Sequence, residues 1–68
     1  MAIENDIRRL RFAHNEMTQA ELATRIGMTR QTVIAIEQNK YAPSLEAAFR
    51  IADALGAPLS DVFRWTRD

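Results

Sequence analysis

One helical segment of this 68-residue sequence carries the side chains that are best suited to chemical recognition. Arg30 and Gln31 bear guanidinium and carboxamide groups, which can form paired hydrogen bonds with guanine and adenine edges. Thr32 and Ala35 can contact a thymine methyl group. At about 100° per residue of a helix, Gln31, Ala35 and Gln38 point to one side. This face alone fits base recognition and an ordinary solvated surface equally well, because arginine, glutamine and threonine are common surface residues.

Two helix starts and one helix stop surround this segment. Thr18 precedes an amphipathic run and Glu21 follows three residues later, which is the spacing of a capping box, so a helix is predicted over residues 19–26. Gly27 can take the left-handed conformation that ends a helix, and Thr29 can cap the next helix. A connection of about three to four residues that contains a glycine is typical of a helix-turn-helix. This pairing of helices favours recognition over a plain solvated face.

The segment before the motif is predicted to be a supporting helix. We expect it over residues 5–14, with Ile7 and Leu10 facing inward. Asn5 or Asp6 is the candidate cap for its first turn.

A later helix is predicted to begin at Ser44, after Pro43, and to end at Gly56. Its apolar residues recur at i, i+3, i+4, i+7 and i+10, which makes them the clearest apolar stripe of the sequence. We predict that this stripe faces the core, and its members are Leu45, Ala48, Phe49, Ala52 and Leu55.

The C-terminal segment, about residues 57–68, is expected to mediate association. Pro58 and Ser60 restart a short fifth helix that runs through Phe63. Trp65 lies where little protein is left to cover it, and aromatic residues are enriched at interfaces. The alternative is that the Trp65 ring folds back onto the core of the monomer. The residues predicted for a dimer interface are Leu59, Val62, Phe63 and Trp65.

Composition bounds the class of protein. With 47% hydrophobic and 26% charged residues, two glycines and two prolines, residues 1–68 are expected to form one globular, helical domain. There is no cysteine, and the one histidine has no second histidine or carboxylate pair around it, so we expect no metal site, no cofactor and no enzyme. No apolar run approaches the ~18 residues of a membrane span. We therefore expect a cytoplasmic protein without a membrane or small-molecule partner.

The charge balance argues against a nucleic-acid partner, but the charge distribution favours one. Nine Lys and Arg residues match nine Asp and Glu residues, whereas nucleic-acid-binding domains are often basic. However, Arg25, Arg30 and Lys40 lie in or beside the motif, while acidic residues gather in the C-terminal third. The recognition face can therefore be positive on a neutral molecule.

A family resemblance rests on two stretches, TQAELATRIGMTRQTVIAIEQNKY and PSLEAAFRIADALG. They resemble the helix-turn-helix domain of the Cro and phage-repressor type, also called the xenobiotic-response-element family, and especially its short single-domain regulators. The resemblance covers about residues 7–63, with the motif at about residues 18–40. It implies an all-α fold, a compact five-helix bundle of the lambda-repressor-like type, in a dimeric DNA-binding protein that is usually a repressor.

The resemblance also assigns roles to single residues. Gln19 resembles the family residue that opens the second helix and binds a backbone phosphate. Glu37 matches an acidic residue that often pairs with an arginine of the first helix, here Arg11. Lys40 and Tyr41 lie where the family touches phosphate, although the Tyr41 ring could instead cover the core. The full set of expected DNA-binding residues is Thr18, Gln19, Thr29, Arg30, Gln31, Thr32, Ala35, Gln38, Lys40 and Tyr41.

Two features depart from the family pattern. Asn39 stands just past the recognition helix, where the family usually has glycine. Asparagine is the non-glycine residue that best tolerates the left-handed conformation, so the turn should survive. The connection over residues 12–17 is about one residue longer than the common spacing, and the expected pairing of Arg11 with Glu37 depends on it.

Two functions follow from these observations. The preferred one is a sequence-specific regulator of transcription that binds double-stranded DNA, most simply a homodimeric repressor on a near-palindromic operator. A two-fold dimer would place two recognition helices roughly 34 Å apart, one helical turn of DNA. The alternative is a protein-interaction module, antitoxin-like or an accessory subunit, that uses the same fold. The neutral charge and the C-terminal aromatic residues favour this alternative.

Overall fold

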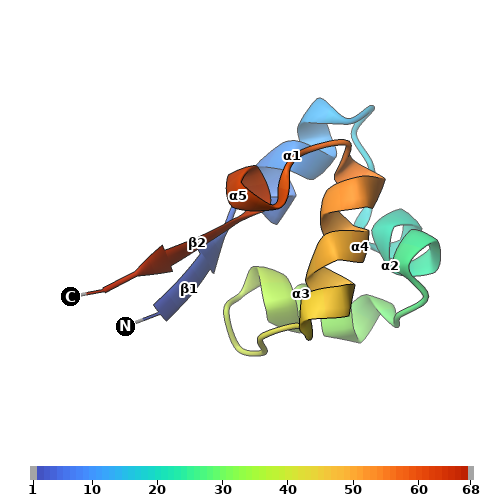
Figure 1. The fold of residues 1–68 in the computed structure, drawn as a ribbon. Coiled ribbons are helices and arrows are strands. Elements are labelled where there is room, and N and C mark those ends of the chain that lie inside the picture. Colours follow the sequence, from blue (N-terminus) through green and yellow to red (C-terminus); the bar gives the residue numbers. More distant parts are fainter. Residues whose placement is uncertain (1, 68) are drawn as a thin grey trace.

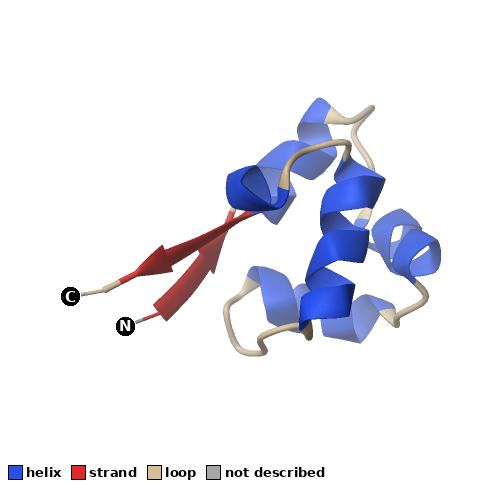
Figure 2. Cartoon of the chain, in the orientation of Figure 1, coloured by secondary structure: helices blue, strands red, loops and turns tan. Residues whose placement is uncertain are grey.

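The computed structural model describes residues 2–67. Within this range the chain forms five helices and two short strands (Figure 1, Figure 2). In chain order they are β1 (Ala2–Asn5), α1 (Ile7–Ala13), α2 (Gln19–Ile26), α3 (Arg30–Glu37), α4 (Leu45–Leu55), α5 (Leu59–Val62) and β2 (Phe63–Thr66). The helices form one body, and the two strands project from it together toward the chain ends (Figure 1).

The expected five-helix fold is confirmed, and two short strands are added to it near the two chain ends. β1 and β2 pair as a two-stranded antiparallel sheet, here called the terminal ribbon, in which Ile3 lies opposite Trp65 and Glu4 opposite Arg64. Each strand has only four residues, and its partner lies at the other end of the chain. Neither a long alternating pattern nor a hairpin turn is therefore present to reveal the ribbon in the sequence.

The predicted helix caps and the predicted helix end within the helix-turn-helix are confirmed. The Thr18 hydroxyl accepts a hydrogen bond from the Glu21 amide at 3.0 Å, and the Glu21 carboxylate accepts one from the Thr18 amide at 3.1 Å. Gly27 ends α2 in the left-handed conformation, with φ of 72°. Thr29 caps α3 by accepting from the Thr32 amide at 3.2 Å. α2 and α3 therefore meet through the short turn that the sequence predicts.

The core lies between the helices, and all five contribute to it. Met17, just before α2, is 2% exposed and belongs to the core. The largest fully buried side chains are those of Ile7, Leu22, Ile26, Ile36, Ile51, Val33 and Val62. No helix within residues 2–67 combines the length and the apolar character needed to cross a bilayer.

The apolar stripe predicted for α4 is confirmed at three members and wrong at two. Leu45 and Phe49 are 69% and 55% exposed. At about 100° per residue they fall on a flank of α4, away from the centre of its buried side chains. The side chains of α4 that are buried are those of Ala47, Ala48, Ile51, Ala52 and Leu55.

α1 is shorter than the predicted range of 5–14. Asp6 occupies the cap position, but its side chain makes no capping hydrogen bond. The side-chain oxygen of Asn5 accepts from the Ile7 amide at 3.2 Å instead. Ile7 is fully buried and Leu10 packs against the core, as predicted.

α5 and the residue after it correct the predicted C-terminal segment. Pro58 occupies the cap position and Ser60 lies inside the helix, so Ser60 is not its cap. Phe63 belongs to β2, so the fifth helix ends one residue earlier than predicted, at Val62. Val62 is fully buried in the core of the monomer, and its assignment to a dimer interface is therefore withdrawn.

Candidate nucleic-acid interface

α3 turns an apolar side toward the core and a polar side toward solvent. Val33 and Ile36 are 1% and 2% exposed, so they anchor the helix. The Thr29 and Thr32 hydroxyl oxygens lie 2.9 Å apart in one hydrogen bond, which adds to the cap at the start of the helix. The predicted base-reading residues share the outer side, with Arg30, Gln31 and Gln38 exposed and Thr32 and Ala35 half-buried.

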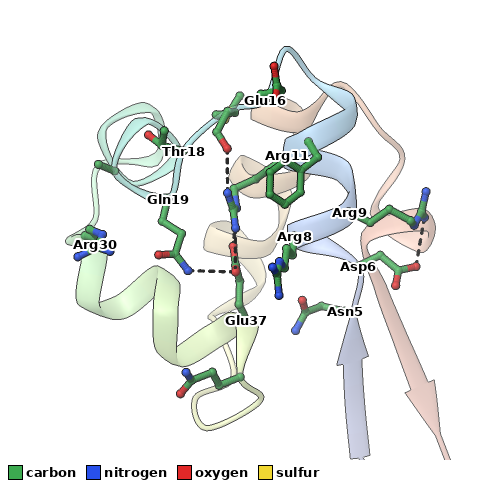
Figure 3. A pocket seen from close by; sticks show the side chains of 14 residues that line it. Asn5, Asp6, Arg8, Arg9, Arg11, Glu16, Thr18, Gln19, Arg30 and Glu37 are labelled. Carbon is green, nitrogen blue, oxygen red and sulfur yellow. Dashed lines mark hydrogen bonds and ion pairs between the residues drawn. The ribbon is translucent and has the colours of Figure 1, made fainter.

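Gln19, the first residue of α2, is tied to the end of α3. Its side-chain amide donates a hydrogen bond to Glu37 Oε1 at 3.2 Å, as Figure 3 shows. A carboxamide nitrogen carries two hydrogens, so the second one stays available to an acceptor outside the protein. The contact orients the Gln19 side chain that is predicted to bind a phosphate.

A buried ion pair lies beneath Gln19. Arg11 Nε donates to Glu37 Oε2 at 2.7 Å and Arg11 Nη2 to Glu37 Oε1 at 3.2 Å, while Arg11 Nη1 donates to the Met17 carbonyl at 2.8 Å. Both charged side chains are 8% exposed. The expected pairing is therefore confirmed despite the longer connection, in which Asn15 and Glu16 take left-handed φ values of 58° and 52°. The pair fixes α1, the start of α2 and the end of α3 to one another.

The end of α3 is held by two asparagines. Asn39 is left-handed, with φ of 60°, as predicted at the position where the family usually has glycine. The side-chain amide of Asn5 donates to the Ile36 carbonyl at 2.9 Å and to the Asn39 side-chain oxygen at 3.0 Å. Sequence reasoning missed this role of Asn5, because its partners lie more than thirty residues away. The contact connects the terminal ribbon to the recognition helix.

A hollow of about 910 Å³ lies between α1, the start of α2 and α3, and we call it the α1–α3 hollow (Figure 3). Four residues of the predicted site line it, namely Thr18, Gln19, Arg30 and Gln38, and the ion pair of Arg11 and Glu37 lies at its centre. Arg8 and Phe12 of α1 line it as well. Sequence reasoning did not single out these two residues, since the first helix carries no recognition motif.

Ion pairing divides the cations of this neutral chain into two groups. Within the part of the chain that the structure describes, four arginines pair with carboxylates, namely Arg9, Arg11, Arg50 and Arg64. Among residues 2–67 the remaining five cations have no carboxylate within 4.0 Å, and these are Arg8, Arg25, Arg30, Lys40 and Arg67. Arg8 and Arg30 both line the α1–α3 hollow. Although the net charge of the chain is zero, the positive charges of these two arginines therefore lie beside α3 without a paired carboxylate among residues 2–67.

Asp6 lines the α1–α3 hollow, but its carboxylate is engaged by arginines of the fold. It accepts hydrogen bonds from Arg9 at 3.3 Å and from Arg64 at 2.5 Å. These bonds, first that from Arg9 and then that from Arg64, lower the pKa of the Asp6 carboxyl below its ordinary value. The Asp6 carboxylate in turn raises the pKa of Arg64. Asp6 therefore links α1 electrostatically to β2.

Lys40 and Tyr41, which follow α3, are both exposed. The Lys40 amide donates to the Ala35 carbonyl at 2.9 Å, so the backbone turns sharply there. The Tyr41 ring is 52% exposed and covers the core only in part. Phosphate contact by these two residues stays a prediction.

Comparison with known proteins gives a consistent result. The model of the Helix-turn-helix family matches residues 7–62. An uncharacterized HTH-type transcriptional regulator of Methanocaldococcus jannaschii is 44% identical over 66 residues, which are 97% of this chain and 98% of that protein. An HTH-type regulator of Bacillus subtilis is 41% identical over 61 residues, 90% of this chain and 91% of that protein. The crystal structure of a candidate DNA-binding protein from Bacteroides fragilis has the same fold, with a TM-score of 0.79 at 24% identity over 91% of this chain and 98% of that one.

The family match includes all five helices, and the two relatives align along nearly the whole chain. The family consists of regulators and not of enzymes. The capped α2, the exposed outer side of α3 and the buried pair of Arg11 and Glu37 are the features of this chain that the match covers. The chain thus belongs to the helix-turn-helix family of DNA-binding transcriptional regulators of the Cro and phage-repressor type.

Proposed function

We propose that this protein is a homodimeric repressor that reads a near-palindromic operator with the outer side of α3. The observation that carries the proposal is the division of α3 into two sides. Val33 and Ile36 hold the helix in the core, while Arg30 and Gln31 extend into solvent just after the capped N-terminus. Arginine and glutamine are suited to guanine and adenine edges in the major groove. A repressor of this kind acts by covering the promoter.

The base-reading role is tested by Gln31→Ala. An operator is first selected from a random duplex pool, and affinity is then measured for that operator and for random duplex. Loss of one paired contact costs about 1–3 kcal/mol, so operator affinity should fall about 5- to 150-fold while affinity for random duplex changes little. Asp61→Ala, on the exposed surface of α5, is the control. Equal losses on both duplexes would refute base reading by Gln31.

The proposed dimer uses one face of the terminal ribbon. Ile3 and Trp65 are cross-strand partners, so their side chains share a face, and they are 46% and 59% exposed. Phe63, two residues before Trp65, lies on the same face. Together with Leu59 these residues line a hollow of about 650 Å³. A second copy of the chain would cover this apolar face. In this interface Ile3 replaces Val62, which is buried in the core of the monomer.

Sedimentation of the wild-type protein at micromolar concentration tests the dimer. We expect a dimer for the wild type and a monomer for Trp65→Ser, because the substitution removes a large apolar surface from the shared face. Phe49→Ser is the matched control, since Phe49 is 55% exposed on α4. A monomeric wild type would refute the dimer. Loss of the dimer with Phe49→Ser, and not with Trp65→Ser, would place the interface on α4.

A second candidate function, binding to another protein, draws support from α4. Leu45 and Phe49 leave an apolar flank exposed, and such flanks occur at protein interfaces. Titration with random duplex at about 50 mM and about 200 mM salt separates the two functions. Phosphate contacts cause a marked loss of affinity between these concentrations. Absence of binding at both would favour a protein partner.

A further inference from the structure

We propose that Arg8 of α1 binds a backbone phosphate of DNA and so extends the DNA-binding surface beyond the two motif helices. This inference rests on the proposed function, because it adds a contact to the same interface. It concerns a residue that neither the motif nor the helix spacing indicates.

The position of Arg8 carries the first part of the argument. Arg8 lines the α1–α3 hollow together with Gln19, Arg30 and Gln38. Figure 3 shows Arg8 on the α1 side and Arg30 on the opposite side, at the start of α3, with Gln19 and Glu37 between them. A nucleic-acid strand that passes Gln19 and enters the reach of Arg30 therefore runs along the hollow that Arg8 lines.

The availability of the charge carries the second part. Arg8 is exposed, and among residues 2–67 no carboxylate lies within 4.0 Å of its guanidinium. Its neighbour Arg9 differs, since Arg9 Nη2 lies 3.3 Å from Asp6. The Arg8 guanidinium instead lies 5.9 Å from the centre of the Phe12 ring. This cation–π contact orients the side chain without neutralising its charge.

The surroundings of Arg8 favour an anionic ligand larger than a single ion. The hollow is also lined by three carboxylates, those of Asp6, Glu16 and Glu37. Asp6 pairs with Arg9 and Arg64, Glu37 pairs with Arg11 at 2.7 Å, and none of the three lies within 4.0 Å of the Arg8 guanidinium. The hollow, at about 910 Å³, is lined in part by Arg30 and Gln38, which were predicted to contact DNA. A phosphodiester chain fits such a trough, because it places one negative charge after another along its length. The contact carries no sequence information, since a phosphate is the same at every base pair.

The test compares three proteins, namely the wild type and the single variants Arg8→Gln and Arg25→Gln. Among residues 2–67 Arg25 likewise has no carboxylate within 4.0 Å, but it lines a different hollow with His14, Arg50 and Asp53. Affinity is measured for the selected operator and for random duplex between about 50 and about 200 mM salt. Loss of one phosphate contact makes the slope of log affinity against log salt less negative by about 0.9. The ratio of wild-type affinity to Arg8→Gln affinity should therefore fall about 3- to 4-fold between the two salt concentrations. The loss should be equal on both duplexes, and Arg8→Lys should restore the slope.

Each outcome separates this inference from the proposed function. A wild type without salt-dependent duplex binding would overturn the proposed function and this inference with it. If the wild type binds duplex but Arg8→Gln and Arg25→Gln show the same slope of log affinity against log salt, the inference is overturned while the proposed function stands. A loss confined to the operator would mean that Arg8 contacts bases, which also overturns it. Melting curves monitor folding, and Arg8→Met is the second charge-removing variant if Arg8→Gln lowers the melting temperature.

Discussion

Replacing Glu37 by glutamine tests how the three helices around the recognition face are held together. The Glu37 carboxylate accepts hydrogen bonds from Arg11 at 2.7 and 3.2 Å and from Gln19 at 3.2 Å. Glutamine has nearly the same shape, but it carries no charge and presents an NH₂ group where one carboxylate oxygen was. Arg11 would then remain buried without its counter-charge, facing a donor.

The structure sets the expected size of the effect. Both side chains are 8% exposed, and removal of one partner from a buried pair costs about 3–5 kcal/mol. A chain of 68 residues has a total stability of about 3–10 kcal/mol. Glu37→Gln therefore removes a large part of the free energy of unfolding. At about 4–8 °C for each kcal/mol in a domain of this size, the melting temperature should fall by at least about 12 °C.

Thermal melting followed by circular dichroism measures this change. Glu46→Gln is the matched control, because Glu46 forms the same kind of pair with Arg50 at 2.6 Å, but with side chains that are 74% and 57% exposed. Surface pairs contribute about 0–1 kcal/mol, so this control should melt near the wild type. The double variant Arg11→Met, Glu37→Leu should regain most of the lost stability, since it leaves no buried charge. A Glu37→Gln protein that melts together with the control would refute the reasoning.

Three further predictions concern the caps and the charges. Thr18→Ala removes the hydroxyl that accepts from the Glu21 amide at 3.0 Å and should lower stability by about 1 kcal/mol; an unchanged urea midpoint would contradict this. Asn39→Ala should be less stable than Asn39→Gly by about 1 kcal/mol, because φ is 60° there and both variants lose the same side chain; equal melting would argue against backbone strain. Asp6→Asn should be less stable than the wild type at about pH 7, and the difference should shrink as the pH falls below 3.8. The reason is that Arg9 and Arg64 lower the folded-state pKa of Asp6 below 3.8, so its stabilisation is present above that value and is lost as pH falls through the lowered pKa; a difference that persists in acid would contradict this.

The motif could be predicted because its signals are local. Thr18 and Glu21 cap α2 across three residues, and Gly27 and Asn39 adopt left-handed conformations that follow from their own residue types. The bounds of α2 were accordingly predicted to the residue. The pairing of Arg11 with Glu37 came from the family resemblance, and the structure confirms it at 2.7 Å.

The pattern of burial could not be predicted in the same way. Leu45 and Phe49 have the spacing of core residues, yet they are exposed, because the helices that pack on α4 cover a different arc of it. Val62 is predicted from the sequence to lie in a dimer interface, but α5 ends there and its side chain completes the core. Periodicity identifies an apolar helix face, but it does not say how much of that face a neighbour covers.

The candidate site shows the same division. Gln31 and its neighbours on α3 could be predicted from their residue types and from the helix that carries them. Arg8 could not, because its role depends on tertiary structure. Among residues 2–67 no carboxylate lies within 4.0 Å of its guanidinium, and it lines a hollow together with Gln19 and Arg30. Nothing in the spacing of α1 distinguishes Arg8 from Arg9, which pairs with Asp6.

The sequence by itself determined where the motif helices begin and end and which side chains α3 offers to solvent. Tertiary structure alone decided that β1 and β2 pair as a ribbon, which apolar side chains are covered and which cations of residues 2–67 lie beside a carboxylate. The physical reason is the sequence separation of the residues that interact. Caps and turns satisfy backbone groups within about one turn of helix, so adjacent residues suffice to specify them. Burial, strand pairing and ion pairing depend on residues that come into contact only when the whole chain has folded.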